Sequence, residues 1–535
     1  MRENTVSALW KVTALAGGVM LALAACGTGG SSTGNAASTA KLVSGATFTY
    51  STSTSLGSLD PYQTTLNDTF VFDSFLYGTL IVLDANGNVQ AQLAEKWSAE
   101  GTKKATFTLR AGVTCSDGSR LQASDVAAVM NYLAKPASRS PLLGQLVQPG
   151  TTATADDATR TVTITSGKPD PFLVESLGST PIVCKAALEN PKLRAEGKAG
   201  SGAYKISEIA QGDHYTAELR TDYAWGPGDW KSNGAGVPAK VTARVVSSPT
   251  TAANLLLSGE LNSARLSGIE QVRVAARKLP SVNTQLPAEL LFNQAAGRPA
   301  ADLAVRTAIV QALDLAKIGK VLSGDKGEPL RQILQGGVPN YCPGNTVQGN
   351  LPATDVAAAK AALDKAGWTV GADGIRAKNG RQLAFVMIYK FTSGQPTAAA
   401  ELIQEQLKAI GVKVTPKVVD GPAAGNALGT DNWDLLMANL QVNNPYAFVP
   451  SFSGAAFPDG GTNFGSAHNA EYDQLTAKAA AMPGKTGCEL WNQAEAALVR
   501  NVDIVPFYAL DTPIFGNRAT FTIARFAWSI QMTAN

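Results

Sequence analysis

Alternation of apolar and polar positions dominates the first half of the chain, and this period of two predicts β-strands. Helical spacing of the apolar positions is confined there to short segments. The expected strands are 46–52, 105–109 and 241–246 with a hairpin over 151–166, and the expected helices are 67–80, 126–133 and 249–259. Ser124 stands where the N-cap of the second helix is expected. The first half therefore predicts an α+β lobe that is rich in strand.

From about residue 290 onward, longer helices alternate with strands, which is typical of an α/β lobe. The expected helices are 302–321, 355–366, 397–410 and 489–500, and the expected strands are 385–388, 412–419, 504–508 and 520–523. Gly367 and Gly411 are expected to end two of the helices. We place lobe I at 43–288, lobe II at 289–508 and a return segment of lobe I at 509–535.

The first 25 residues have the pattern of a secretory signal. Arg2 and Lys11 precede an apolar run that ends in small residues and is short for a membrane-spanning helix. Leu23-Ala24-Ala25-Cys26 resembles the lipobox of bacterial lipoproteins, which implies cleavage before Cys26 and a diacylglyceryl group on its sulfur. The alternative is an ordinary signal peptide or membrane anchor with a chance cysteine. Residues 26–42 lack periodicity and read as a flexible tether.

Composition narrows the class of protein. The chain has 535 residues, 45% of them hydrophobic, which exceeds what one hydrophobic core accommodates and favours two lobes. A formal net charge of +3 gives no electrostatic case for nucleic acid. No second apolar run is long enough to span a bilayer. We therefore expect a soluble body held at the outer, periplasmic face of the cell membrane by a lipid.

Four cysteines remain if Cys26 carries lipid, namely Cys115, Cys184, Cys342 and Cys488. An even number in an oxidising compartment favours disulfides, and four cysteines allow three connectivities. We prefer Cys115–Cys184 and Cys342–Cys488, because each pair then stays inside one lobe. Four buried free thiols are the alternative. Wide spacing and only two histidines, His214 and His468, predict no metal site.

Several short segments, taken together, form a combination that is more specific than any one of them. The strongest is Ser116-Asp117-Gly118 followed by Ala123-Ser124-Asp125-Val126. Others, in chain order, are Leu59-Asp60-Pro61, Leu93-Ala94-Glu95-Lys96-Trp97, Phe107-Thr108-Leu109-Arg110, Gly200-Ser201-Gly202-Ala203-Tyr204, Ser258-Gly259-Glu260-Leu261, Phe292-Asn293, Val305-Arg306, Ala312-Leu313-Asp314, Ala366-Gly367-Trp368 and Ile410-Gly411-Val412. In their order and spacing these segments resemble the bacterial extracellular solute-binding proteins of family 5. In the Ser258 segment, Asn262 stands where that family has aspartate.

The resemblance implies a two-lobe clamshell of the periplasmic-binding-protein type, with a discontinuous first lobe. It implies a substrate-binding lipoprotein that acts as a monomer and delivers solute to the permease and ATPase subunits of an ABC importer. Neither catalysis nor a cofactor is implied. Ligand lies in the cleft, and it stabilises the closed form only by contacting both lobes.

Peptide-binding members carry an aspartate four residues before a proline on a loop of the second lobe, where it pairs with the peptide's α-ammonium. Here Gln441 stands at that position, before Pro445. A neutral amide cannot supply a charge-assisted hydrogen bond, so we expect a peptide-like or another polar solute. The candidate ligand contacts are Gln441, Asn439, Asn443, Asn444, Tyr446 and Tyr389 in lobe II, and Asn67 and Phe70 in lobe I. The amides have an alternative role in satisfying a turn, and the aromatics in the core.

Two other functions remain as alternatives. Ser323-Gly324-Asp325-Lys326 and Lys485-Thr486-Gly487 match two elements of the penicillin-recognising serine enzymes, in which Ser323 would be the nucleophile and Lys326 its activator. The Ser-Asp-Asn element between them is missing. A surface adhesin that kept the fold is the second alternative. Nickel transport is disfavoured, because imidazole is a favoured ligand of that metal and the chain has only two histidines.

Overall fold

The computed structural model describes residues 41–84, 87–335, 341–389, 394–419, 427–428, 432–440, 444–459, 461–524 and 527–534. The chain from Lys41 to Asn535 forms one compact unit. The predicted signal peptide, with Cys26, lies outside the described residues, as do Gln441 and Asn443. In the described part of the chain, no helix is both long enough and apolar enough to span a bilayer.

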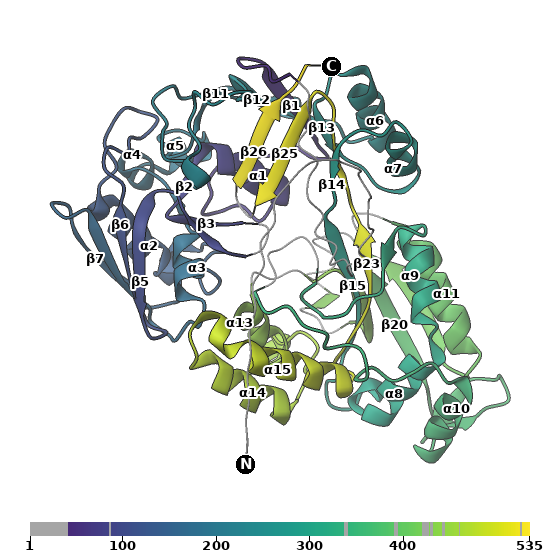
Figure 1. The fold of residues 1–535 in the computed structure, drawn as a ribbon. Helices are drawn as coiled ribbons and strands as arrows, with labels where there is room; N and C mark the ends of the chain where they lie inside the picture. The colour runs from purple at the N-terminus through teal and green to yellow at the C-terminus, as the bar shows by residue number, and fades with distance from the viewer. Residues whose placement is uncertain are drawn as a thin grey trace, which may run out of the picture. The chain divides into compact units, whose positions relative to one another are not determined.

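A seven-stranded sheet forms the base of the first lobe (Figure 1). Its central strand β1 runs parallel to both β12 and β13. The predicted alternation is visible in β1, where Phe48, Tyr50 and Thr52 are buried. In sheet order the strands are β10 (Tyr204–Ala210), β11 (His214–Leu219), β12 (Lys240–Val245), β1 (Thr47–Thr52), β13 (Ser263–Arg265), β24 (Ile514–Gly516) and β14 (Ser281–Val282).

A separate four-stranded sheet also belongs to the first lobe. Phe107 and Val162 lie opposite each other in neighbouring strands and are fully buried. In sheet order the strands are β5 (Ala94–Glu100), β6 (Lys104–Leu109), β8 (Thr161–Thr165) and β7 (Thr152–Asp156). The main helices of this lobe are α1 (Asn67–Leu76), α2 (Ala123–Leu133), α3 (Leu173–Gly178), α4 (Lys185–Glu189), α5 (Pro191–Ala195), α6 (Pro249–Ser258) and α7 (Gly268–Ala275).

The second lobe is built on a six-stranded sheet covered on both faces. Leu290 and Phe292 pack in one cluster with α8, α9, α10 and α11, while Leu291 packs in another with α13, α14 and α15. The strands in order are β16 (Gly327–Glu328), β23 (Ile504–Asp511), β15 (Gln285–Phe292), β22 (Leu435–Ala438), β20 (Ala384–Tyr389) and β21 (Lys413–Val418). The helices are α8 (Leu303–Ala312), α9 (Leu315–Ser323), α10 (Val356–Lys365), α11 (Pro396–Lys408), α13 (Pro445–Phe448), α14 (Ala470–Ala480) and α15 (Cys488–Arg500).

Smaller elements complete the fold. They are the pairs β2 (Gly78–Thr79) with β9 (Pro181–Ile182), β3 (Ile81–Leu83) with β4 (Val89–Ala91), and β25 (Ala519–Ala524) with β26 (Ala527–Met532), and the set β17 (Thr369–Val370), β18 (Arg376–Lys378) and β19 (Arg381–Gln382). The chain therefore has the predicted mixture of helix and sheet in two lobes.

Two neighbouring extended segments connect the lobes. β14 and β15 lead into the second lobe, and β23 and β24 lead back, so that β24 lies between β13 and β14 in the first sheet. At the crossing, the Thr512 amide donates a hydrogen bond to the Thr284 carbonyl oxygen at 2.7 Å. The two threonine hydroxyls lie 2.9 Å apart. The first lobe is thus discontinuous in sequence.

Both preferred disulfides are formed. Cys115 is bonded to Cys184, and Cys342 is bonded to Cys488. The first bond joins the segment before α2 to the start of α4. The second fixes the loop that contains Cys342 to the first residue of α15, and Cys342 itself packs into the hydrophobic cluster of the first lobe. The second disulfide therefore lies where the two lobes meet.

The glycine turn before β10 is explained by close packing on α1. A Cβ atom at Gly200 would lie 2.1 Å from the Leu76 carbonyl oxygen, and one at Gly202 would lie 2.4 Å from that of Phe75. Between them, the Ser201 hydroxyl donates to the Ile182 carbonyl oxygen at 2.6 Å. Only residues without a side chain allow the backbone to pass the end of α1 this closely.

Three predicted elements differ from the structure. The helix predicted over 302–321 is two helices, α8 and α9, because Leu313 is extended and the Asp314 carboxylate caps α9 by accepting from the Lys317 amide. Ser124 is not the N-cap of α2, since Gln122 and Asp125 form a capping box there. The helix predicted over 67–80 ends at Leu76, where the chain becomes extended.

Candidate functional site

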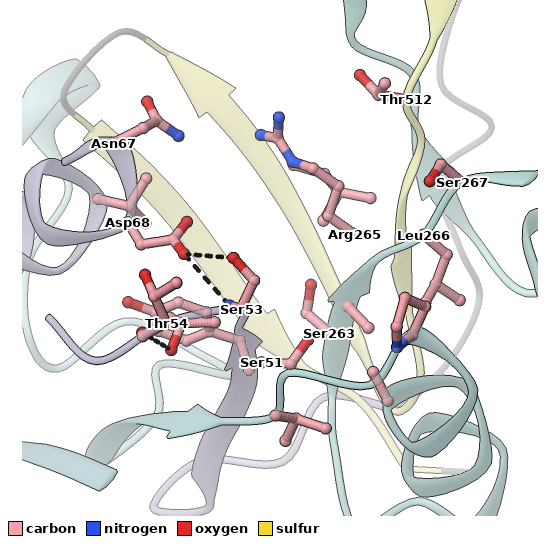
Figure 2. Close-up of a pocket in the computed structure, with 18 of the residues that line it drawn as sticks. Ser51, Ser53, Thr54, Asn67, Asp68, Ser263, Arg265, Leu266, Ser267 and Thr512 are labelled. Carbon is pink, nitrogen blue, oxygen red and sulfur yellow. Dashed lines mark hydrogen bonds between the residues drawn. The ribbon is translucent and has the colours of Figure 1, made fainter. Parts of the chain in front are cut away.

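A cavity of about 410 Å³ lies beside the crossing strands. It is lined by the ends of β1 and β13, by the first turn of α1, and by Leu286 and Thr512 from the crossing segments. Figure 2 shows side chains from these elements facing a common space. Cavities of roughly 300–1,000 Å³ are typical of sites for small molecules. The position and volume make this cavity the candidate binding site.

Pairing between β1 and β13 determines where the polar residues of the cavity lie. Tyr50 of β1 lies in register with Ser263 of β13. Asn262 fixes this register, because its side-chain oxygen accepts from the Thr49 amide at 2.9 Å and its side-chain nitrogen donates to the Asn517 carbonyl oxygen at 3.1 Å. An ionised aspartate could not donate the second bond. The amide therefore ties β1 to the C-terminal return segment.

Arg265 and Asp68 are the charged residues of the cavity (Figure 2). The side chain of Arg265 is exposed, yet the surrounding protein lowers the pKa of its guanidinium by desolvation. Together these observations place the group in a recess that water reaches. Burial raises the pKa of the Asp68 carboxyl, while hydrogen bonds from Ser53 and the charge of Arg265 oppose that shift. The Ser53 amide and hydroxyl lie 3.3 and 3.5 Å from the Asp68 carboxylate.

Ser263 supplies an unsatisfied polar group. The residue is 1% exposed, and its hydroxyl has no hydrogen-bond partner among the described residues. A buried polar group without a partner costs free energy unless water or ligand satisfies it. The remaining wall is largely apolar, with contributions from Leu66, Val71, Val246, Leu266, Leu286 and Ile514. The cavity is therefore suited to an amphipathic solute.

The two ligand contacts predicted in the first lobe, Asn67 and Phe70, lie in different surroundings. Asn67 is exposed and lines the cavity, where its amide faces the same space as Arg265 (Figure 2). Phe70 is half-buried and packs against the hydrophobic cluster of the first lobe. Ser263 and Arg265 were not predicted as ligand contacts, because a strand of three residues is too short to show a period in the sequence. The available sequence signal was the short alternation in which Ser263, Arg265 and Ser267 are separated by Ala264 and Leu266.

Most of the predicted second-lobe contacts follow β22 in the chain, whereas Tyr389 is the last residue of β20. Asn444 caps α13, with its side-chain oxygen accepting from the Ala447 amide at 2.8 Å. Tyr389 is buried, and its hydroxyl lies 3.3 Å from that of Thr397. Tyr446 is half-buried, with its ring centroid 6.3 Å from that of Trp491. The side-chain nitrogen of Asn439 is buried without a partner among the described residues.

Two buried carboxyl groups lie behind the segment that contains Asn439. Glu289 is 0% exposed, and its carboxylate accepts from the Leu440 amide at 3.0 Å. Glu495 is also buried and accepts from the Thr346 hydroxyl at 2.6 Å and from the Ile333 amide. Burial raises the pKa of Glu495 to about 7, and it raises the pKa of Glu289, to which the charge of Glu495 contributes. The available sequence signal was an isolated carboxylate within each apolar run.

A second contact between the lobes lies at Phe172. Its ring centroid lies 5.0 Å from that of Tyr341 and 6.4 Å from that of Trp491. Next to it, the Gly484 amide donates to the Pro171 carbonyl oxygen at 2.6 Å. Burial raises the pKa of the nearby Asp170 to about 6. This contact and the crossing strands join the lobes at two places.

The geometry around Ser323 does not favour a nucleophile. Ser323 is the last residue of α9, whereas an activated serine of the penicillin-recognising kind begins a helix. Its hydroxyl lies 3.3 Å from the Lys320 carbonyl oxygen, and Lys326 is exposed. In the described ranges, no group of three or more His, Cys, Asp or Glu side chains is placed to hold a metal ion.

Comparisons with known proteins agree with this architecture. Residues 88–463 match the model of the bacterial extracellular solute-binding proteins, family 5. The probable deoxycholate-binding periplasmic protein of Escherichia coli is 24% identical over 498 residues, covering 86% of this chain and 87% of that protein. The oligopeptide-binding protein AppA of Bacillus subtilis is 25% identical over 442 residues, covering 75% of each. A substrate-binding protein from Microbacterium hydrocarbonoxydans, solved with 4-hydroxybenzoate hydrazide, superposes with a TM-score of 0.73 at 25% identity, covering 91% of this chain and 100% of that one.

Proposed function

Because the chain belongs to the bacterial extracellular solute-binding proteins of family 5, we propose that it captures a peptide-like or other polar solute between two lobes. The solute is then delivered to the permease of an ABC importer, whose ATPase drives transport. The protein acts as a monomer. Its lobes comprise residues 43–288 with 509–535, and residues 289–508.

The cavity beside the Thr284–Thr512 crossing carries this proposal. It takes its walls from the first lobe and from the strands that lead into the second. A solute bound there touches the segments whose bending would move one lobe against the other, and ligand contacts that differ between two arrangements shift their populations. The contact at Phe172 then forms part of the closed arrangement.

Asn439, Gln441, Asn443, Asn444 and Tyr446 complete the proposed site from the second lobe. The side-chain nitrogen of Asn439, which is buried and has no partner among the described residues, supports a ligand contact in this segment. Gln441 offers an amide where peptide-binding relatives carry a carboxylate, so it binds a neutral or blocked group more readily than a free ammonium. Asn67 contributes from the first lobe.

We also propose that the protein is lipid-anchored outside the cytoplasmic membrane through Cys26. The segment Leu23-Ala24-Ala25-Cys26 and the tether to residue 42 support this assignment. Cys26→Ser in the full chain is expected to abolish acylation and to release the mature protein from membranes. Fractionation and intact mass of the lipid-bearing product measure both effects, with Cys115→Ser as a control that keeps the lipid. Membrane retention of the Cys26→Ser protein would contradict the anchor.

Native mass spectrometry of the chain from Gly27 onward tests solute capture. A co-purifying mass that is released by mild heating is expected, and fragmentation identifies its class. A peptide supports the peptide-like assignment, whereas a neutral glycan moves the substrate class and leaves solute capture intact. An empty protein whose melting temperature no peptide or glycan mixture raises would favour an adhesin.

The serine-enzyme alternative has its own test. A labelled β-lactam acylates a penicillin-recognising enzyme, and a binding protein takes up no label. Stoichiometric labelling that is lost in Ser323→Ala would overturn the binding-protein proposal. The position of Ser323 at the end of α9 leads us to expect none.

A further inference from the structure

The charged groups of the candidate cavity point to the class of solute, an inference that rests on the proposed function. Four arginines of the described chain are buried, and each has protein partners. Arg194 pairs with Asp60, and Arg220, Arg306 and Arg376 donate to backbone carbonyl oxygens. Arg265 faces the cavity, and among the described residues its guanidinium has no hydrogen-bond or ion-pair partner.

Two further groups face the same space. Ser263 lies two residues before Arg265 on β13, so both side chains point to one face of the strand. Its buried hydroxyl is unsatisfied. Across the cavity, Leu66 is the N-cap residue of α1 and provides no side-chain hydrogen bond, and Asn67 is the first residue of the helix. The Arg265 guanidinium, the Ser263 hydroxyl and the uncapped amides of α1 together supply hydrogen-bond donors for oxygen atoms. The guanidinium and the helix N-terminus also attract negative charge.

The remainder of the cavity supplies an apolar surface. Leu66, Val71, Leu266 and Leu286 line it together with Ile514. Its volume of about 410 Å³ lies near the lower end of the range for small-molecule sites. A long peptide would not be enclosed there, whereas a compact molecule with an apolar body would be.

We infer that the solute carries a carboxylate and an apolar body, and that Arg265 binds the carboxylate with Ser263 as a supporting donor. Asp68 faces the same space from the first turn of α1 (Figure 2). One of its carboxylate oxygens accepts from Ser53, which leaves the other for a positively charged group of the solute. The carboxylate therefore has two sources, a simple apolar acid or the acid end of a zwitterion.

Isothermal titration of the purified full chain with matched probes tests the inference. The probes are 3-phenylpropionate and N-acetylphenylalanine, each with its primary amide, and free phenylalanine as the zwitterion. The wild-type protein is expected to prefer each acid over its amide. Arg265→Gln is expected to weaken acid binding by roughly 10- to 100-fold, the value of a lost charge-assisted pair, and to bring the acid-to-amide ratio close to one.

Arg244→Gln is the control, because Arg244 is a half-exposed arginine of β12, separated from β13 by β1, that does not line the cavity and pairs with Glu260. It should leave the ratio unchanged. Asp68→Asn distinguishes the two sources of the carboxylate. If the solute is a zwitterion, this variant is expected to weaken binding of free phenylalanine and to leave binding of 3-phenylpropionate and N-acetylphenylalanine unchanged. Circular dichroism melts verify that each variant is folded.

Equal binding of acids and amides by the wild type, or an unchanged ratio in Arg265→Gln, would overturn the carboxylate inference while solute capture stands. Absence of binding for every probe contradicts the inference at this cavity. In that case the mass of a co-purified solute still decides the proposed function separately.

Discussion

The ring of Phe172 lies against that of Tyr341, with centroids 5.0 Å apart and planes inclined at 52°. Phe172 precedes α3 in the first lobe, and Tyr341 adjoins Cys342, whose disulfide holds it beside α15. An aromatic ring of one lobe therefore occupies a site whose shape depends on a covalent bond in the other. We therefore expect the closed arrangement of the two lobes to depend on the Cys342–Cys488 disulfide.

Phe172→Ala should loosen the contact between the lobes. Removing a buried phenylalanine ring costs about 3–5 kcal/mol in a packed core, and here much of that packing is between lobes. We expect more open arrangements, seen as a larger radius of gyration by small-angle X-ray scattering, and weaker solute binding. Phe457→Ala changes a 36%-exposed ring and is the control. An unchanged radius and affinity would show that Phe172 does not hold the lobes together.

Replacing both Cys342 and Cys488 by serine should destabilise the protein. The bond closes a sequence separation of 146 residues, and loss of a native disulfide typically costs about 2–5 kcal/mol. Urea denaturation of the full chain measures the change in its free energy of unfolding. The double variant of Cys115 and Cys184, separated by 69 residues, provides the comparison in the first lobe. Identical midpoints in oxidised and reduced wild-type protein would argue against both bonds.

Glu495 should make stability depend on pH. Its pKa is raised from 4.5 to about 7 by burial, so the folded protein binds a proton that the unfolded chain has lost between these values. Its contribution is present below about pH 4.5 and is lost as the pH rises through 7, by about 3–4 kcal/mol in total. Buried Glu289, whose carboxyl interacts with Glu495, changes in the same direction, and Tyr472 stays neutral over this range.

The comparison of Glu495→Gln with wild type isolates this group. The variant keeps an acceptor for the Thr346 hydroxyl and lacks a titrating proton, so its unfolding free energy should vary less between pH 4.5 and 7. Glu489→Gln alters an exposed carboxylate on the same helix and should follow the wild-type curve. Parallel curves for wild type and Glu495→Gln would contradict the assignment.

Arg194→Met should be strongly destabilising. The Arg194 guanidinium lies 3.1 Å from the Asp60 carboxylate, and both side chains are almost inaccessible. Removing one partner of a buried pair leaves an uncompensated charge, at a cost of about 3–5 kcal/mol. Arg160→Met breaks a half-exposed pair with Glu95 and should cost less than about 1 kcal/mol. Chemical denaturation of the two variants compares these values, and similar losses would refute the distinction.

The fold was predictable where a local signal decides the outcome. Gly259, Gly367 and Gly411 have positive φ angles at or just after helix ends, and glycine alone adopts such angles without strain. The break between α8 and α9 was not predictable from periodicity, because the apolar spacing continues through Leu313. There the Leu313 carbonyl oxygen accepts from Thr354, and the Asp314 amide donates to Gln406, both distant in sequence.

The candidate site was predictable only in part, for the same reason. Asn67 was selected from an aromatic-rich helix and lines the cavity, whereas Arg265 was overlooked in a strand of three residues. Arg265 gains its significance from neighbours that pairing brings together, with β1 and β24 on either side of β13. Gln441 was selected by resemblance, and its role stays a prediction.

The position of β24 bears on the order in which the protein is made. β14 is paired only with β24 in the first sheet, and β24 begins at Ile514, so the sheet started by β1 stays incomplete until nearly the whole chain has been synthesised. A polypeptide that emerges from the ribosome amino-terminus first cannot complete this sheet until the segment that begins at Ile514 has also emerged. The topology itself delays completion of the first lobe until synthesis of the chain is almost finished.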